Sequence, residues 1–527
     1  MKNRQQDHVV TLIWAETNNV RSNFRRVFLR IMTIFIFFFC LLYVLYSIIC
    51  LNPSFKLTQR PLDTFMRFDQ ENTIQKNLNI IPPEKTQLHH IVFGIGSSNA
   101  TWNYRKEYVK LWWNPNKMRG FVWLDKNMSS TSNYDNVTTT TSLPKIMISS
   151  DTSRFRYTNK NGDRSGIRIS RVLSETVRAD SENVRWYVMG DDDTFFVPEN
   201  LVRVLRKYDH KQFYYIGSVS ETHWQNHEFS YNMAYGGGGF AISYPLAKAI
   251  EKMQDKCIQR YPYLYGSDDR MQACMAELGV PLTKEVGFHQ FDLYGNVMGL
   301  LSAHPVAPLI SLHHLDKIQP IFPNVTRVKA LKRLKKPITL DSAGLMQQSI
   351  CYDRPRKWTI SVSWGYSVQI NRGILPAREI EKPITTFNDW YGTNDENSLT
   401  FNTRPYHGNG CQRPYFYLLS NAYTSTTNDT TTSVYAHDGA PGGKCKWRMA
   451  DPSRIRHVNV YKKPDPNLWD KSPRRNCCRV LPTNKNDTLL IDSPTPTPSL
   501  SLWFLSDMER RSDYTYCHVQ QKTYNAS

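Results

Sequence analysis

The stretch Trp186–Val197, which reads WYVMGDDDTFFV, decides the fold of this chain. An apolar run stops at Gly190, the three carboxylates Asp191–Asp193 follow, and apolar residues then resume. This pattern predicts a buried strand that carries three adjacent negative charges at its end, and a cation or hydrogen-bond donors must offset their repulsion. Oxygen ligands favour Mg²⁺ or Mn²⁺. The stretch therefore predicts a metal site, and the alternative is a solvated turn in which one aspartate caps a helix that begins near Pro198.

Strands alternate with helices on the N-terminal side of this stretch. The apolar patterns predict strands at His90–Gly94, Gly120–Leu124 and Lys145–Ser149, and helices at Tyr104–Trp112 and Ser165–Arg178. Alternation of this kind is typical of an α/β sandwich, which we expect over residues 88–330.

The composition changes beyond residue 340. Residues 340–527 contain six cysteines and many prolines and threonines. Apolar residues alternate over Trp358–Ile370, and the same period recurs at Val458 and Val460 and at Leu500–Phe504. We therefore expect a C-terminal β-rich unit held by disulfides, and its six cysteines allow 15 pairings, between which the sequence does not choose.

The N-terminal part contains a long apolar run. Residues 31–51 are uncharged and mostly apolar, which is the length that crosses a bilayer as a helix. The alternative, a cleaved signal peptide, has a shorter apolar region of about 7 to 15 residues and a small-residue cleavage site. Basic residues precede the run, so we predict a cytoplasmic tail at 1–30, a single-pass type II anchor at 31–51 and a polar stem at 52–87.

Glycosylation sites and cysteines agree with a lumenal placement of everything beyond the anchor. Seven N-x-[ST] sites all follow it, at Asn99, Asn127, Asn136, Asn324, Asn428, Asn486 and Asn525. Eight of the ten cysteines also follow it, an even number in a space that permits disulfides.

The formal net charge of +20 does not predict nucleic-acid binding. Part of the excess lies in the N-terminal tail, and the rest is spread without a basic stripe. The excess fits anionic nucleotide sugars or acidic polysaccharides, and it fits a solvated basic surface equally well.

Two further motifs carry candidate chemistry. A run of four glycines, at Gly236, Gly237, Gly238 and Gly239, precedes an apolar strand-like stretch, so the backbone there can approach a bulky ligand; an ordinary loop is the alternative. Asp268 lies between Cys257 and Cys274, and a disulfide between these cysteines would hold its carboxylate in place. Asp268 is then a candidate base, or else the N-cap of the helix that follows it.

Histidines form the last candidate group. His289 lies in an apolar setting, and His313 and His314 follow a second apolar stretch. A lone histidine is more often a packed residue than a metal ligand, and the residues themselves do not choose between these positions.

The ordered motifs resemble the fringe-like β-1,3-glycosyltransferases, which are inverting enzymes with the GT-A fold. The resemblance runs from about residue 88 to 320 and rests on the strand into Asp191–Asp193, on Tyr235–Phe240, on Ser267–Asp269 and on Phe288–Gln290. The lumenal part resembles even more closely a fringe-related group that is common in plants. Members of this group have an uncharacterised C-terminal region (DUF604) with a segment like Arg474–Cys478.

The resemblance implies roles for individual residues. Asp193 and His289 would bind Mn²⁺ or Mg²⁺, Asp191 and Asp192 would contact the donor nucleotide or order its surroundings, and Asp268 would be the general base. The four glycines would line the donor pocket. The implied donor is a UDP-sugar, the implied acceptor is a hydroxyl of a glycan, glycoprotein or polysaccharide, and the implied location is the Golgi membrane with the catalytic domain in the lumen.

Two other classes of function compete with this interpretation. One is a non-catalytic glycan-binding or chaperone-like protein on the same fold. The other is a hydrolase with Asp191 and Asp268 as acid and base, which the triple carboxylate explains less well than a metal site does.

Overall fold

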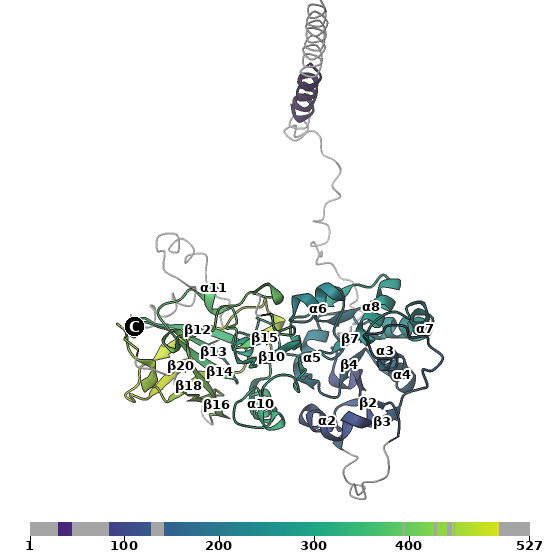
Figure 1. Cartoon of the computed structure of the whole chain (residues 1–527). Coiled ribbons are helices and arrows are strands. Elements are labelled where there is room, and N and C mark those ends of the chain that lie inside the picture. The colour runs from purple at the N-terminus through teal and green to yellow at the C-terminus, as the bar shows by residue number, and fades with distance from the viewer. Residues whose placement is uncertain are drawn as a thin grey trace, which may run out of the picture. The chain divides into compact units, whose positions relative to one another are not determined.

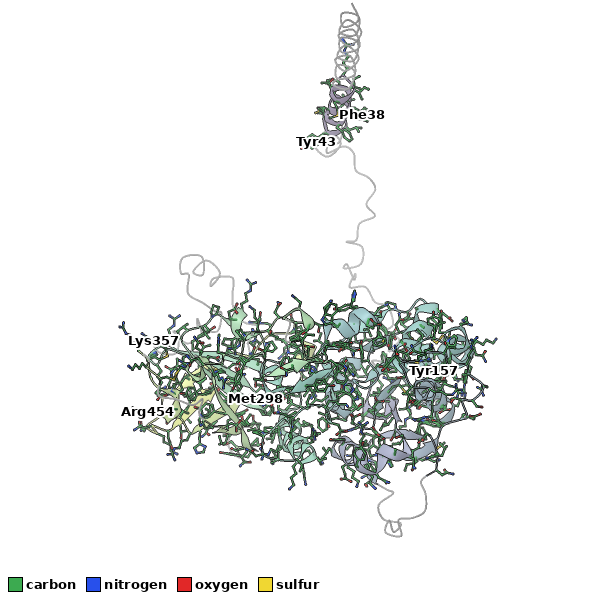
Figure 2. The ribbon with its side chains drawn as sticks, viewed as in Figure 1. Phe38, Tyr43, Tyr157, Met298, Lys357 and Arg454 are labelled. Atoms are coloured by element: carbon green, nitrogen blue, oxygen red, sulfur yellow. A yellow bond between two sulfur atoms is a disulfide. The ribbon has the colours of Figure 1, made fainter. Side chains whose placement is uncertain are left out.

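The computed structural model describes residues 30–44, 84–127, 142–393, 396–425, 429–439, 445–446 and 448–494. The chain divides into two compact units, Met1–Pro82 and Pro83–Ser527. In the first unit, residues 30–44 are helical (Figure 1), with exposed apolar side chains such as Phe38 and Tyr43 (Figure 2). Among the described residues, no helix combines the length and the apolar character that crossing a membrane needs. Residues 45–51 of the predicted anchor lie outside the described residues.

A mixed seven-stranded sheet forms the first half of the second unit, in the order β3-β2-β1-β4-β7-β6-β8. The strands are β1 (Ile91–Gly96), β2 (Arg119–Leu124), β3 (Lys145–Ile148), β4 (Trp186–Asp191), β6 (Tyr215–Gly217), β7 (Phe240–Ser243) and β8 (Leu282–Lys284). β1 to β4 pair in parallel, whereas β7 runs antiparallel to both of its neighbours. The strands that the sequence predicts here are confirmed within a few residues.

Helices cover both faces of this sheet because side chains alternate along each strand. Ile91, Phe93 and Ile95 of β1 join one buried cluster with α2 (Asn99–Trp112) and α5 (Pro198–Leu205). Val92 joins the other cluster, which contains residues of α4 (Val172–Ala179), α7 (Tyr244–Arg260) and α8 (Ser267–Glu277). The predicted α/β sandwich is therefore confirmed.

Two details of the helical layer bear on the predictions. The helix expected at Ser165–Arg178 is broken into α3 (Ser165–Ser170) and α4, and Arg171 at the break binds Asp255 at 2.9 Å and Glu175 at 3.2 Å. The disulfide expected between Cys257 and Cys274 is present and joins α7 to α8.

Short elements connect this sheet to the rest of the unit. β5 (Phe195–Phe196), β11 (Ser311–His313) and β9 (Phe288–Gln290) form a three-stranded sheet. β10 (Leu293–Gly295) pairs with β15 (Phe387–Asp389), which comes from the C-terminal part of the chain. The short helices are α6 (His223–Glu228), α9 (Met298–Leu301) and α11 (Ala377–Ile380).

The C-terminal part forms an eight-stranded sheet in the order β12-β13-β14-β16-β17-β18-β20-β19. Its strands are β12 (Gln348–Asp353), β13 (Trp358–Ser363), β14 (Ser367–Arg372), β16 (Tyr415–Thr424), β17 (Thr431–His437), β18 (His457–Lys462), β19 (Arg479–Leu481) and β20 (Thr488–Asp492). The disulfides Cys351–Cys478 and Cys411–Cys445 lie within this β-rich part.

One strand prediction in this part is wrong. The alternating stretch Trp358–Ile370 is not one strand but the hairpin of β13 and β14. Gly365, at the turn, has a φ of +77°, which a residue with a side chain rarely adopts. The strand at Val458 and Val460 is confirmed as β18, and Leu500–Phe504 lies outside the described residues.

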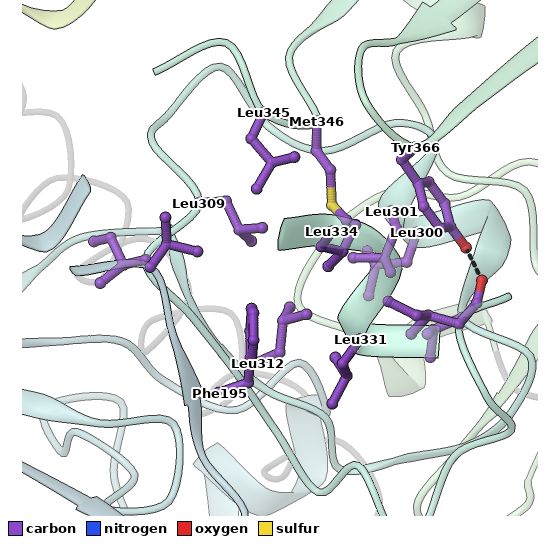
Figure 3. Packing of buried hydrophobic residues seen from close by; sticks show 14 of the residues in the cluster. Phe195, Leu300, Leu301, Leu309, Leu312, Leu331, Leu334, Leu345, Met346 and Tyr366 are labelled. Carbon is purple, nitrogen blue, oxygen red and sulfur yellow. Dashed lines mark hydrogen bonds between the residues drawn. The ribbon is translucent and has the colours of Figure 1, made fainter. Parts of the chain in front are cut away.

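The two sheets share one hydrophobic core. Figure 3 shows Leu309 and Leu312 of the first half packed near Leu331 and Leu334 of helix α10 (Arg327–Asp341) and near Tyr366, whose hydroxyl donates to the carbonyl of Ile321 at 2.8 Å. Met298, labelled in Figure 2, belongs to the same cluster. At the end of α10, a buried ion pair joins Asp341 to Lys462 of β18. The predicted domain boundary near 330–340 stays a prediction, and it falls inside α10.

Candidate active site

The three aspartates lie where the sequence predicts them, at the carboxyl end of β4. β1 and β4 run in parallel, and Gly96 at the end of β1 pairs with Asp191. Asp192 and Asp193 are 2% and 1% exposed, while Asp191 is partly exposed. The acidic turn thus sits at the edge of a sheet, which is where α/β proteins usually bind ligands.

Asp191, Asp193 and His313 form a possible metal site. His313 Nε2 lies 3.2 Å from Asp193 Oδ1 and 3.6 Å from Asp191 Oδ2. One ligand atom from each residue lies within 4.8 Å of the others. Two carboxylates and one imidazole form a donor set that suits Mn²⁺, so these residues fit a divalent ion.

His289, which the family resemblance implies as a ligand, is not part of this cluster. β9 and β11 pair in parallel, with Leu312 opposite His289 and His313 opposite Gln290. Opposed residues share a face of the sheet and successive ones do not, so His289 faces away from His313. Its Nδ1 lies 2.9 Å from Glu221 Oε1 and its Nε2 lies 2.9 Å from His304 Nε2. The structure therefore places His313, and not His289, beside Asp193.

Gln290 fixes the orientation of His313. The backbone N–H of Gly238 donates to Gln290 Oε1 at 2.8 Å, which identifies that atom as the amide oxygen. His313 Nδ1 lies 2.9 Å from the same oxygen and must donate to it. Burial lowers the pKa of His313 despite the nearby Asp193, which favours the neutral ring, and in that form with Nδ1 as donor the lone pair of Nε2 is available to a cation. A cation bound between Nε2 and the carboxylate oxygens would interact favourably with both.

Asp192 is held by protein donors. Ser97 and Thr101 donate to its Oδ2 at 2.7 Å each, and Arg105 Nη1 donates to its Oδ1 at 2.9 Å. Its side chain therefore anchors the start of α2 to the acidic turn, and its role toward the donor stays a prediction.

Arg105 is a site residue that the sequence reasoning missed. Its guanidinium also lies 3.3 Å from Asp193 Oδ1 and donates to Asp316 Oδ2 at 3.0 Å, while Tyr108 donates to the other oxygen of Asp316 at 2.6 Å. Part of the signal was present, because Arg105 and Tyr108 lie three positions apart on one face of the predicted helix; Thr101 joins that face in α2, which begins earlier than predicted.

The pKa values of the two carboxyls in the cluster shift in opposite directions. Burial, followed by the charges of Asp193 and Asp268, raises the pKa of Asp191 well above its usual value. Burial also opposes ionisation of Asp193, but His313 and Arg105 outweigh it and hold the pKa of that carboxyl low. A divalent cation would offset the repulsion between these carboxylates.

Asp268 lies in the first turn of α8 and lines the same small cavity as Asp191. The backbone of Gly236 donates to its carboxyl, and Ser267 Oγ donates at 2.9 Å. Burial nevertheless raises the pKa of Asp268 to about 6. The N-cap of α8 is Gly266, and Asp269, at the third helical position, accepts from its backbone at 3.0 Å, so Asp268 is not the N-cap.

The glycine run has no side chains, so Asp268 and His313 approach its backbone closely. A Cβ at Gly236 would lie 2.5 Å from Asp268 Oδ1, and one at Gly237 would lie 2.0 Å from His313 Cε1. Gly237 also accepts from Thr194 Oγ1 at 2.7 Å. The run thus lies between Asp268, the candidate base, and His313, the candidate metal ligand. Its role in donor binding stays a prediction.

A cleft of about 390 Å³ opens beside the acidic turn. Arg105 and Arg168 line it together with Asp191 and Tyr265. Arg168 is held by carbonyls, donating to Ser97 O at 2.7 Å and to Trp123 O at 3.2 Å. Two fixed guanidinium groups beside a cation site suit an anionic ligand such as a diphosphate.

The C-terminal part contributes an aromatic residue to this site. Trp390 follows β15 and stacks on His314, with ring centroids 5.1 Å apart and planes 12° apart. Its ring also stacks on Tyr294 at 4.9 Å and 11°. His314 in turn lies 4.2 Å from the ring of His313 and pairs with Asp292 at 2.9 Å. The column of rings therefore runs from the C-terminal part to the candidate metal ligand.

Two structural features define the class of this protein. One is a mixed α/β fold with disulfides, and the other is a cluster of carboxylates, suited to a divalent cation, at the carboxyl end of the central strand. Two family models match the sequence. The Fringe-like model covers residues 86–306, and the model described as "Protein of unknown function, DUF604" covers residues 225–478. The chain therefore contains a fringe-like region and, overlapping it, a DUF604 region.

Comparison with other known proteins adds little detail. No curated protein matches the sequence. Among solved structures, mouse xyloside xylosyltransferase 1 is 10% identical, with 36% of this chain and 82% of that chain covered and a TM-score of 0.23. The mannosyltransferase PcManGT from Pyrobaculum calidifontis, solved with GDP-Man and Mn²⁺, is 13% identical, with 50% and 74% covered and a TM-score of 0.22. We draw no argument from such low scores.

Proposed function

We propose that this protein is an inverting, metal-dependent hexosyltransferase of the GT-A fold. It transfers a sugar from a UDP-sugar to a hydroxyl of a glycan, glycoprotein or polysaccharide, in a β-1,3 linkage as the family implies. The observation that carries the proposal is the position of Asp268, a carboxyl with a pKa near 6, in the same cavity as the metal-type cluster that contains Asp191.

The residues of the site divide the work of this reaction. Asp268 accepts the proton of the acceptor hydroxyl, whose oxygen attacks the anomeric carbon as the bond to the UDP oxygen breaks. Its pKa suits a base that works near neutral pH. A divalent ion held by Asp191, Asp193 and His313 would supply Lewis-acid stabilisation of the departing diphosphate.

Protein cations support the same step. Arg105 and Arg168 line the cleft beside the acidic turn, where their charges would favour the diphosphate of the donor. One displacement from the opposite face inverts the anomeric centre, so the reaction needs no second carboxylate as a nucleophile.

The proposed location follows from the N-terminal sequence. Residues 31–51 would anchor the chain as a type II protein in the Golgi membrane, with the fringe-like and C-terminal parts in the lumen. Protease protection of the C-terminal side in sealed Golgi vesicles tests this, and digestion from the outside would contradict it.

Mutation of Asp193 and Asp268 separates metal binding from base catalysis. The full-length protein should release UDP from a UDP-sugar in the presence of Mn²⁺, and Asp193→Ala should abolish release. Asp268→Asn should lower transfer by about 10²- to 10⁴-fold while donor binding is kept. Equal loss of binding and transfer in Asp268→Asn would make the residue structural, and donor binding without any turnover in the wild type would favour the non-catalytic class.

The pH profile provides a second readout of the base. The pKa of Asp268 is about 6, and a base must be deprotonated, so kcat/KM should rise as the pH increases through that value. A profile that is flat between pH 5 and pH 7 would contradict the role of Asp268.

A further inference from the structure

A cavity larger than the cleft beside the aspartates lies elsewhere in the second unit. It has a volume of about 830 Å³, within the range of about 300–1,000 Å³ that is usual for small-ligand sites. His289 and Phe288 of β9 form part of one wall, and the C-terminal residues Phe401 and Arg378 line it as well. The side chain of His289, which faces away from His313, lies in this wall.

A chain of buried hydrogen bonds lies in the wall of this cavity. His304 Nδ1 must donate to the carbonyl of Pro305 at 2.8 Å, since a carbonyl only accepts. His304 Nε2 then accepts from His289 Nε2 at 2.9 Å, and His289 Nδ1 accepts from Glu221 at 2.9 Å. The chain is complete when Glu221 is protonated and both rings are neutral. This wall therefore adds no charge to the cavity.

The rim of the cavity is basic. Lys284, Arg378, Lys382 and Arg475 line it, against the carboxyls of Glu221 and Glu381. Arg475 binds Glu381 at 3.0 Å, and Lys382 binds Glu379 at 2.9 Å. Lys284 and Arg378 are exposed and form no ion pair among the described residues. The cavity thus has an excess of positive charge that protein carboxylates do not offset.

We propose that this cavity is a second ligand site, separate from the donor site, and that it binds an acidic oligosaccharide through Arg378 and Lys284. A carboxylate on the sugar chain would pair with these cations. Hydroxyl side chains such as Thr400 and Thr403 would hydrogen-bond its ring hydroxyls, and Phe288 and Phe401 supply apolar surface. The choice of a saccharide among anions rests on the proposed function, whereas the site itself rests on the cavity and its charge.

Residues from both halves of the second unit form this site. Arg378 and Phe401 come from the C-terminal part, while Lys284 and Phe288 come from the fringe-like part. The proposal thus gives the C-terminal part a role in binding a sugar chain at a distance from the reacting hydroxyl.

Binding of a defined acidic sugar tests the proposal. Calorimetry on the full-length protein should detect trigalacturonate and should not detect the neutral trisaccharide maltotriose. Arg378→Glu should weaken trigalacturonate binding by about ten-fold or more, since a hydrogen bond to a charged group contributes about 1.5–3 kcal/mol. Val286→Trp should also block binding, because Val286 is 41% exposed and lines the cavity, so a larger ring there fills space without entering the core.

Control variants separate this site from others. Lys332→Glu changes an exposed cation on α10 that lines a different cavity, and it should leave trigalacturonate binding unchanged. Asp193→Ala should also leave it unchanged, whatever its effect on UDP release.

Three outcomes would overturn the proposal. Equal loss of binding in Lys332→Glu and Arg378→Glu would show a general effect of charge. Loss of trigalacturonate binding in Asp193→Ala with retention in Arg378→Glu would place the sugar at the donor site. Displacement of trigalacturonate by inorganic phosphate at equal concentration would identify a phosphate site instead.

Discussion

The two faces of β9 perform different tasks with neighbouring residues. Gln290 points to the acidic turn, where it accepts a hydrogen bond from His313. His289, one position earlier, points to the large cavity and lies between Glu221 and His304. One face therefore orients a candidate metal ligand, and the other closes a neutral hydrogen-bond chain.

This difference shows which surroundings suit a histidine to bind a metal ion. Both His289 and His313 are buried, 4% exposed in each case, so burial does not distinguish them. The difference lies in the second ring nitrogen. His313 Nε2 lies within 4 Å of two carboxylates, those of Asp193 and Asp191, whereas His289 Nε2 lies against the neutral ring of His304.

The largest expected effect contrasts the two histidines. His313→Ala should raise the dissociation constant for Mn²⁺ by about 100-fold or more, since even outer partners of a metal ligand contribute about 10- to 100-fold. His289→Asn should leave Mn²⁺ affinity within about two-fold, on the scale of a change that touches no ligand. Titration of Mn²⁺ by electron paramagnetic resonance measures both, and the reverse pattern would restore His289 as the ligand.

Gln290→Met should have the next largest effect. The change keeps the volume but removes the oxygen that fixes His313, so Mn²⁺ affinity should fall by about ten-fold. His289→Asn on the same strand is the matched control, since it changes the opposite face. An unchanged Mn²⁺ titration in Gln290→Met would show that His313 needs no such support.

Trp390→Ala tests the contribution of the C-terminal part to the metal face. Loss of the stack on His314 should lower Mn²⁺ affinity by about five-fold, because an aromatic pair contributes about 0.5–1.5 kcal/mol. Trp390→Phe should recover most of the affinity. Trp224→Ala, at an exposed tryptophan on α6, serves as the control, and an equal loss there would count against the stack.

Glu221 gives the smallest expected effect and tests the cavity face. Burial, with the nearby Asp292 adding to it, raises the pKa of Glu221 well above 4.5. Glu221→Gln, a neutral isostere that can donate to His289, should change the unfolding free energy by less than about 1 kcal/mol, while Glu221→Ala should cost about 1–3 kcal/mol. Denaturant unfolding measures both, and a larger loss in Glu221→Gln than in Glu221→Ala would contradict a protonated Glu221.

The pH dependence of Glu221→Gln sharpens the same point. A raised pKa in the folded state stabilises the wild type fully below the unfolded value of 4.5. That contribution is lost as the pH rises through the folded pKa. The wild type should therefore lose stability relative to Glu221→Gln as the pH increases above 4.5, and a constant difference between the two would contradict the assignment.

Sequence periodicity predicted most of the fringe-like half. The apolar strand that ends at Asp191 lies at the centre of the sheet, and the disulfide between Cys257 and Cys274 is present. These features depend on local alternation and on short spacings, which a sequence displays directly. The hairpin at Gly365 was missed because a turn inside an alternating stretch leaves the period almost unchanged.

The sequence by itself determined the acidic turn, the base candidate Asp268 and the class of fold, because each rests on a contiguous motif. Only the tertiary structure decided which histidine joins Asp193, because that choice depends on the register between β9 and β11. It also decided that Arg105 enters the site and that Trp390 reaches it from the C-terminal part. The contacts of Asp193 with His313 and Arg105, and of Trp390 with His314, join residues that are 120, 88 and 76 positions apart, and no local pattern records them.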